Sequence, residues 1–432
     1  MCFGVLFSAI LAALMAVLVA AFYGQGASAW AIGFVYVAYD CGLQVMLLLL
    51  AWRAVSRAAS RPPGNANGPE PTLAIIVPCR NEALVLPACV LALRAQLAAT
   101  DQLLVVDDGS TDGTAAWCQA QGVAVLIKAN SGKADSLNQA IAMVTHDVVV
   151  TIDADTIVRP GALAAVRQAF CDARLVAAGG LLEVTTRPAF FGPWLGWQQQ
   201  AEYLRSFLWR AAWEHLGTLL LISGAFAAYR RTVLVAVGGL ATTSLVEDYE
   251  LTHRLHRAAI DGGHDWRLGM IPGAQAVTDA PATLRLFLAQ RTRWFSGFIT
   301  VHFANRDLVG ARRAKALGLI MLPIKTMDLL LPIYGFLALA VLLAFLGFGF
   351  AVPRIILWVL AAKVVFDVGV AAAAVLLMRR WAGWTAGQGP GLLSVLAASV
   401  CEAFVYQAWR QLAALLGWIG FLRRRTTWTP QR

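Results

Sequence analysis

Two carboxylates spaced one residue apart end an apolar run near the middle of the chain. Residues 147–155 read DVVVTIDAD, so Asp153 and Asp155 follow continuous β-branched residues. An uninterrupted apolar run is typical of a parallel strand buried on both faces, and ligands of open α/β sheets bind beyond the carboxyl ends of such strands. Carboxylates there suit Mg²⁺ or Mn²⁺, whose other ligands can be substrate phosphates. For this motif alone, a helix N-cap followed by a surface turn remains the alternative.

Three earlier apolar runs also end in polar loops. The loops read PCRNEA, DDGS and KANSGK in chain order, and helical stretches separate the apolar runs. Alternating strands and helices predict a doubly wound, mostly parallel sheet whose loops converge on one crevice. We expect strands over 73–77, 103–106, 123–127 and 147–152, with helices over 82–98, from a cap at Ser110 or Thr111, and up to Thr145.

The loop sequences separate three kinds of crevice. A dinucleotide site needs GxGxxG after the first strand, where PCRNEA stands instead. A P-loop needs GxxxxGK[ST], and Ser131-Gly132-Lys133-Ala134 does not supply it. A nucleotide-sugar site fits best, because carboxylates can bind base and ribose, a lysine can bind the diphosphate and the paired aspartates can bind a metal ion.

Long apolar segments flank this region. The chain of 432 residues is 59% hydrophobic and 14% charged, whereas soluble domains carry about 25% charged residues. A membrane span needs about 20 apolar residues, and several segments reach that length. We therefore expect an integral membrane protein, with segments at 1–23, 29–52, 329–353, 355–378 and 392–422.

The first segment and the last one each leave a choice open. A cleaved signal peptide ending at Ala27-Ser28-Ala29 would need a basic start, which is missing, so a retained span is favoured. The basic groups beside the spans, such as Arg53 and Arg379, predict that residues 72–300 face the cytoplasm in a multi-pass plasma-membrane protein. The basic tail also favours the cytoplasm, which requires 392–422 to cross an even number of times, as a hairpin or a re-entrant element; a single crossing would break the charge rule there.

Charge and cysteine usage exclude further classes. The net charge is +10, and the basic residues cluster beside the apolar segments, which favours anionic lipid headgroups over nucleic acid as the partner. The seven cysteines form no CxxC pair, which argues against structural zinc and a disulfide framework. Within the last apolar segment, Glu402 and Arg410 fall on one helix face, and ionisable residues in a span usually mark a pathway.

Seven motifs in order carry a family resemblance. They are PCRNEA, VVDDGSTDGT, SGKADSLN, TIDADT, ISGAFAAYRR, VEDYELTHRL and QRTRW. The chain resembles the processive, membrane-integrated family 2 glycosyltransferases, which include poly-N-acetylglucosamine, hyaluronan, chitin and cellulose synthases. The resemblance implies two N-terminal transmembrane helices (1–60), a linker (61–71), a cytosolic GT-A domain (72–300), an interface helix (301–328), transmembrane channel helices (329–422) and a basic tail (423–432).

The resemblance also implies roles for the donor side of the crevice. Lys133 would contact the diphosphate, and Asp153 and Asp155 would hold the diphosphate and the metal, with Asp155 the more direct ligand. A solvated surface lysine is the alternative for Lys133, and a turn with a helix cap is the alternative for residues 107–110. The uracil and ribose would lie against Pro78, Arg80, Asn81, Glu82, and Asp107 or Asp108.

The acceptor side is implied in the same way. Glu247 and Asp248 match the family's TED motif, with Asp248 as the general base and Val246 in place of the usual Thr. Helix capping is the alternative for Asp248, and membrane-interface anchoring is the alternative for QxxRW. The loop near the acceptor would contain Ser223 and Gly224, and the QxxRW residues are Gln290, Arg293, which would pair with the diphosphate, and Trp294, which would offer a flat face to the terminal sugar.

The function predicted is an inverting, metal-dependent, processive β-glycosyltransferase. It would polymerise UDP-N-acetylglucosamine into an exopolysaccharide and translocate it across the plasma membrane, with a small membrane accessory subunit as a further partner. Ala178-Gly179-Gly180-Leu181 lacks an Asn found in close poly-N-acetylglucosamine synthases, so a glucan or a hyaluronan-like polymer is an alternative. Single transfer to a lipid acceptor is another alternative, and a transporter whose cytosolic domain only binds nucleotide is a third.

Overall fold

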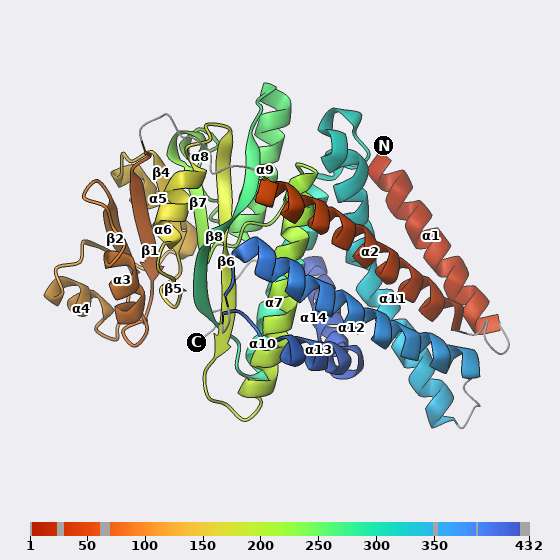
Figure 1. Cartoon of the computed structure of the whole chain (residues 1–432). Coiled ribbons are helices and arrows are strands. Elements are labelled where there is room, and N and C mark those ends of the chain that lie inside the picture. The colour runs from red at the N-terminus through yellow and green to blue at the C-terminus, as the bar shows by residue number, and fades with distance from the viewer. Residues whose placement is uncertain (1, 24–29, 61–69, 349–352, 386–387, 424–432) are drawn as a thin grey trace.

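A computed structural model describes residues 2–23, 30–60, 70–348, 353–385 and 388–423. The sheet lies at one side, long helices extend from the other, and α7 (Gly192–His215) and α10 (Leu284–Ala304) lie between them (Figure 1). The signal-peptide site at 27–29, most of the linker and all but the first residue of the basic tail lie outside the described residues.

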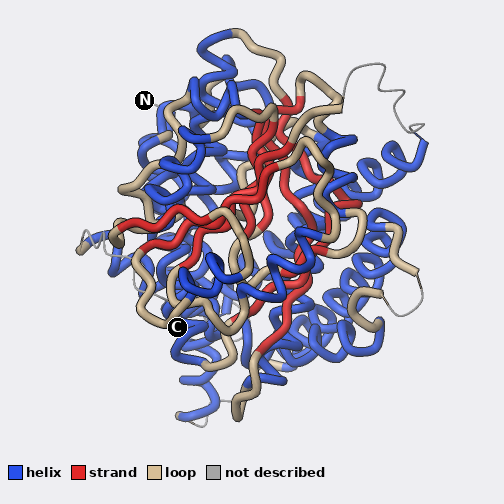
Figure 2. The backbone as a smooth tube through the Cα atoms, turned by 90° about the vertical axis from the view of Figure 1, so that its left-hand side faces the viewer, coloured by secondary structure: helices blue, strands red, loops and turns tan. Residues whose placement is uncertain are grey.

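One mixed sheet organises the region between the N-terminal and C-terminal apolar segments. Within the described residues its eight strands run in the order β3-β2-β1-β4-β7-β6-β8-β5, and they form a continuous layer with helices on both sides (Figure 2). Strand β7 is antiparallel to β4 and β6, and β5 is antiparallel to β8, while the other pairs are parallel. The mostly parallel sheet with helices on both sides confirms the predicted α/β architecture. The strands are β1 (Leu73–Cys79), β2 (Gln102–Asp108), β3 (Val125–Lys128), β4 (Val148–Ile152), β5 (Ile157–Val158), β6 (Leu175–Thr186), β7 (Phe226–Arg230) and β8 (Arg267–Ala280).

Strands β1 and β4 form the centre of the core. Every residue of both strands is buried, including Val148, Val149 and Val150, as the continuous apolar runs predict. Burying one such side chain contributes about 1.5–3 kcal/mol, so the sheet forms a firm base for the loops at its edge. The helices around it are α3 (Leu86–Arg94), α4 (Thr114–Ala120), α5 (Lys133–Met143), α6 (Ala162–Ala169), α8 (Arg231–Ala236) and α9 (Glu247–Gly262).

Two helices begin later than the sequence predicts. Helix α3 begins at Leu86 rather than Glu82, because Pro87 fits the first helical turn and the preceding residues form a separate turn. Helix α4 begins at Thr114 after Gly113, whose φ of 87° is left-handed, so neither Ser110 nor Thr111 caps it. Both side chains instead join contacts between neighbouring loops.

Four helical runs in the described residues are long and apolar enough to cross a membrane. They are Ala31–Ala58, Leu317–Gly347, Arg354–Ala382 and Leu392–Leu422, and they flank the sheet in sequence. The N-terminal helix α1 (Cys2–Tyr23) contains a shorter apolar stretch, Phe3–Ala13. The remaining long helices are α2 (Ala31–Ser60), α11 (Leu322–Gly347), α12 (Arg354–Ala382), α13 (Leu392–Cys401) and α14 (Gln407–Leu422).

The predicted interface helix over 301–328 is wrong as a single element. Helix α10 ends at Ala304, and two 3₁₀ turns, η2 (Arg306–Leu308) and η3 (Arg312–Ala314), follow it. Gly310 and Lys315 have positive φ values of 73° and 48°, which interrupts helical geometry. Helical structure resumes in the π turn η4 (Leu317–Met321), which leads directly into α11.

The last apolar segment is one helical run. Helix α13 passes through the π turn η5 (Glu402–Tyr406) into α14, and the joining residues Cys401 and Gln407 keep right-handed helical geometry. A hairpin within 392–422 is therefore excluded. π turns inside helices are rare and frequently mark functional sites.

Candidate active site

The loops after β1 and β2 are fixed to each other by side chain to backbone hydrogen bonds. Asn81 has a left-handed φ of 57°, and its Oδ1 accepts a bond from the Thr111 N–H over 2.8 Å. The Asn81 N–H donates to Ser110 Oγ over 2.9 Å, and the Glu82 N–H donates to Thr114 Oγ1 over 3.1 Å. This pairing leaves the Arg80 side chain exposed at the rim and Pro78 buried at the end of β1.

Asp108 fixes the next loop. Its carboxylate accepts bonds from Lys128 Nζ (2.6 Å), the Ser131 N–H (2.9 Å) and the Gly132 N–H (2.8 Å). Burial alone would raise the pKa of Asp108, but these donors hold it below the ordinary value. Asp107 is also buried and accepts from the Ser110 N–H over 2.8 Å. Both carboxylates therefore shape the loops, and the Asp107 to Ser110 bond forms the turn that the sequence offered as an alternative.

Lys133 links the third loop to the paired aspartates. It is the first residue of α5, and its ammonium contacts the Asp153 carboxylate. Its Nζ also lies 3.4 Å from the carbonyl oxygen of Gly224. Burial favours the neutral amine, but the negative charges of Asp153 and Glu247 raise the pKa of Lys133 above its ordinary value. The lysine is thus a cation held beside the two aspartates.

The surroundings of Asp155 disfavour its ionised form and raise its pKa. Burial, and then the charges of Asp153 and Asp279, raise the pKa of Asp155 to about 7. Its Oδ1 accepts a hydrogen bond from Thr278 Oγ1 over 3.2 Å. Two neighbouring carboxylates that repel each other are a fitting donor set for a divalent cation, which would relieve the repulsion. No group of three or more His, Cys, Asp or Glu side chains suited to a metal occurs in the described residues, so most ligands would come from diphosphate and water.

Gly224 brings the acceptor side against the donor side. Its N–H donates to Asp248 Oδ2 over 2.9 Å, while its carbonyl lies beside Lys133. A Cβ placed on Gly224 would lie 3.5 Å from both Asp248 Oδ2 and Lys133 Nζ. Asp248 lies in the first turn of α9, and Val246, not Asp248, is the N-cap residue.

Burial, opposed by Lys133 and reinforced by Asp248, raises the pKa of Glu247.

Helix α10 carries the QRTRW residues against the loop that precedes α9. Arg293 Nη1 donates to the carbonyl oxygen of Leu245 over 2.8 Å. Gly297, one turn further on, packs so closely on Val246 that a Cβ there would lie 2.5 Å from the valine methyl. Val246 is buried, which explains how an apolar residue is accommodated at this position. Gln290 is also buried, and Trp294 is half-buried on the same helix.

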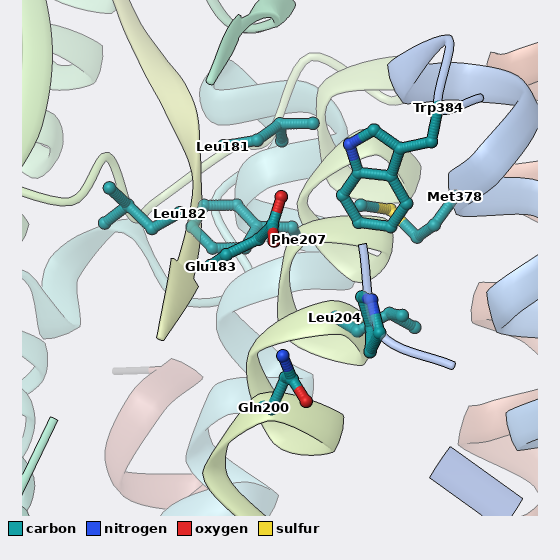
Figure 3. Close-up of a pocket in the computed structure, with 9 residues that line it drawn as sticks. Leu181, Leu182, Glu183, Gln200, Leu204, Phe207, Met378 and Trp384 are labelled. Carbon is teal, nitrogen blue, oxygen red and sulfur yellow. The ribbon is translucent and has the colours of Figure 1, made fainter. Parts of the chain in front are cut away.

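A separate pocket lies between β6, α7 and the end of α12. Figure 3 shows that its lining is mainly apolar, with Glu183 as the one charged side chain. That carboxylate is paired with Arg159 at 2.8 Å. The pocket therefore lacks the cations and free carboxylates that a nucleotide diphosphate and its metal need. It is lined by Leu181, Leu182, Glu183, Gln200, Leu204, Phe207, Met378, Trp384 and Pro390.

Three residues of this site were missed from the sequence. Lys128 neutralises Asp108, while Thr278 and Asp279 approach Asp155 from β8. A signal existed for the last two, because VTDA ends an apolar strand much as TIDAD does. Lys128 had a weaker signal, since its contact depends on the register of β3 beside β2.

Known proteins of similar sequence include enzymes that transfer N-acetylglucosamine. An N-acetylglucosaminyltransferase of Mesorhizobium japonicum is 30% identical over 247 residues, which is 52% of this chain and 55% of that protein. A poly-beta-1,6-N-acetyl-D-glucosamine synthase of Staphylococcus aureus is 27% identical over 272 residues, 61% of this chain and 62% of that protein. The chain thus spans little more than half the length of these relatives.

A solved structure supports the fold. The mannosyltransferase PcManGT from Pyrobaculum calidifontis, solved in complex with GDP-Man and Mn²⁺, superposes with a TM-score of 0.57 at 22% identity, covering 87% of this chain and 99% of that one. The family described as glycosyltransferase like family 2 matches residues 69–297, more than half of the 432 residues. The protein therefore belongs to the glycosyltransferase like family 2.

Proposed function

We propose that the protein is an inverting, metal-dependent, processive β-glycosyltransferase that polymerises a UDP-sugar. UDP-N-acetylglucosamine is the first choice of donor, since the relatives' names specify N-acetylglucosamine transfer and a poly-N-acetylglucosamine product. The proposal includes translocation of the polymer across the plasma membrane through the long helices, with the domain 72–300 in the cytoplasm. A growing polysaccharide, the lipid bilayer and a small membrane subunit are its partners.

One observation carries the proposal: Lys133 and Asp248 meet at Gly224, and Asp153 contacts the same lysine. This arrangement would hold a general base, Asp248, and a cation for a leaving diphosphate, Lys133, on either side of Gly224. Asp248 would take the proton of the acceptor hydroxyl as that oxygen attacks C1 of the donor sugar. A positioned base contributes about 10²–10⁴-fold to the rate.

Positively charged side chains of the site would neutralise the negative charge that develops on the leaving group. Lys133 and Arg293 would contact the diphosphate, the lysine as a compact charge and the arginine through its planar fork. A divalent ion held by Asp155 and Asp153 would, when bound, neutralise charge on the leaving nucleotide. The similar mannosyltransferase was solved with Mn²⁺, which supports a divalent cofactor here without separating Mn²⁺ from Mg²⁺.

The nucleoside and the acceptor would bind to the flanking loops. Arg80, Asn81, Glu82 and the end of β1 at Pro78 are proposed contacts for uracil and ribose, with Asp107 and Asp108 holding those loops in shape. Trp294, with Gln290 beside it on α10, would stack against the terminal sugar of the acceptor. Ser223, Gly224 and Glu247 would line the space between the acceptor and the donor.

The experiment that tests the function uses purified membranes containing the full chain. They are incubated with Mg²⁺ or Mn²⁺ and radiolabelled UDP-N-acetylglucosamine, UDP-glucose, UDP-glucuronate or GDP-mannose, and products are separated by size. We expect high-molecular-weight product from UDP-N-acetylglucosamine. A lipid-soluble product carrying one sugar would overturn processivity, and nucleotide binding without turnover of any donor would overturn the enzyme assignment.

A further inference from the structure

A buried ionic cluster connects the site to the last membrane helix. Glu202 on α7 accepts a hydrogen bond from Arg291 Nη2 on α10 over 2.8 Å and another from the Tyr406 hydroxyl in η5 over 2.5 Å. Arg410 Nε on α14 lies 3.6 Å from the same carboxylate. Side chains of α7, α10, η5 and α14 therefore meet at one glutamate, and η5 is the turn that joins α13 to α14. Figure 1 shows α7, α10, α13 and α14 in the same region of the molecule.

A second carboxylate extends the cluster. Glu402 of η5 is paired with Arg205 of α7 and with Arg410, the latter at 3.0 Å. Within the described residues the two glutamates thus face three guanidinium groups, and all but Arg410 have side chains no more than 15% exposed. Removing one member of such a cluster leaves charge without compensation in a poorly hydrated place, which is strongly unfavourable.

Arg291 links this cluster to the tryptophan of the QRTRW motif. Its guanidinium lies 4.5 Å from the ring centroid of Trp294, within the range of a cation–π contact. The other side of Arg291 is held by Glu202. Glu202 on α7 therefore holds the Arg291 guanidinium in place against the Trp294 ring on α10.

Buried N–H groups without hydrogen-bond partners occur on the same two helices, α7 and α10. Arg291 Nε is buried and has no hydrogen-bond partner among the described residues. Arg210 Nε and Nη1, two turns beyond Glu202 on α7, are also buried and unpartnered there. Buried N–H groups left without acceptors are rare in proteins, and the hydroxyl and ring oxygens of a saccharide are one kind of acceptor that could satisfy them.

We propose that Glu202 is a positioning residue that acts through Arg291 to hold Trp294 against the terminal sugars of the polymer. This inference rests on the proposed polymerase function. Tyr406 and Arg410 belong to the last helical run and both contact Glu202. The cluster therefore fixes the position of Trp294 relative to the membrane segment through which the polymer would leave. Glu202 therefore governs how many sugars are added before release, more than it governs each transfer.

Product length and initial rate separate these two effects. Glu202→Gln keeps the shape of the side chain but removes its charge, and we expect the mean product length to fall roughly tenfold, the order of effect produced by contacts that couple strongly. The initial rate of UDP release should fall much less. Arg291→Lys provides a second variant, since lysine keeps the charge but loses the planar stacking on Trp294; it should also shorten the product.

Asp101→Asn is the matched control. Asp101 is a fully buried carboxylate paired with Arg167 at 2.7 Å, and it lies before β2, at the end of that strand away from the proposed site. The control should lower thermal stability but leave the product length unchanged. Equal shortening in Asp101→Asn and Glu202→Gln would reduce the effect to general destabilisation and overturn the inference.

A double variant tests whether Glu202 acts through the tryptophan. If it does, adding Glu202→Gln to Trp294→Ala leaves product no shorter than Trp294→Ala gives alone. Additive shortening, or wild-type length in Glu202→Gln, contradicts the inference. A wild-type enzyme that adds one sugar contradicts the proposed function instead, before any variant is compared.

Discussion

The Gly224 N–H donates to Asp248 Oδ2 over 2.9 Å, and a side chain on Gly224 would point between that carboxylate and Lys133. The two charged residues come from the starts of α9 and α5, and the glycine precedes β7. The absence of a Cβ therefore keeps open the space in which acceptor and donor would meet.

Gly224→Ala should fold normally and lose activity. The added methyl would make contacts of 3.5 Å, which is ordinary packing distance, so stability should change little. The same methyl occupies the space between base and lysine, and a displacement of about 1 Å near reacting groups can cost about 10²-fold in rate. Transfer rate and melting temperature are measured together. Gly42→Ala, whose added Cβ would meet no atom within 4 Å, is the control and should behave as wild type.

Asp248→Asn should retain donor binding and lose transfer by about 10²–10⁴-fold, the usual contribution of a positioned base. The amide oxygen can still accept the Gly224 N–H, so the loop should keep its position. Calorimetric titration with UDP checks binding, and release of UDP in the presence of acceptor checks turnover. Near-wild-type turnover would remove Asp248 from the role of base.

Asp155→Ala should abolish activity together with its dependence on Mg²⁺ or Mn²⁺. The substitution removes the carboxylate that burial and Asp153 keep at a raised pKa of about 7, and with it the proposed metal contact. Activity is measured across a titration of EDTA followed by restoration with each metal. A variant that remains active in EDTA would falsify the metal role, and Asp265→Asn, at an exposed carboxylate, is the control.

A continuous valine run is typical of a parallel strand buried on both faces, so the sequence predicts the strand that ends just before Asp153 and Asp155. The order of the loops follows from the same alternation of strands and helices. Contacts between distant helices could not be read in this way. Glu202 and Arg291 lie 89 positions apart, and their meeting depends on how α7 and α10 pack. The break after Ala304 likewise depends on the left-handed residues Gly310 and Lys315, where lysine gives no local sign of that geometry.

Two buried histidines should make the protein less stable in acid. Burial lowers the pKa of His253 to about 3 and that of His302 to about 4, well below 6.5. Both are therefore neutral in the folded state, where His253 Nδ1 lies 2.9 Å from the Tyr249 carbonyl oxygen and His302 Nε2 lies 2.9 Å from Thr326 Oγ1. As the pH falls below 6.5 the unfolded chain binds protons that the folded chain cannot, so each histidine should cost about 1.4 kcal/mol of stability per pH unit until its folded pKa is reached.

The difference between variants isolates this effect from opposing titrations. Asp155 and Glu247 have raised pKa values, so they bind protons in the folded state first and stabilise it as the pH falls through the same range. Melting temperatures of wild type and His253→Gln should therefore be compared at each pH from 7.5 to about 4.5. The variant should start less stable, because a buried contact is altered, and should lose less stability than wild type on acidification. If the melting temperatures of wild type and His253→Gln fall in parallel as the pH is lowered, the loss of stability in acid does not come from His253.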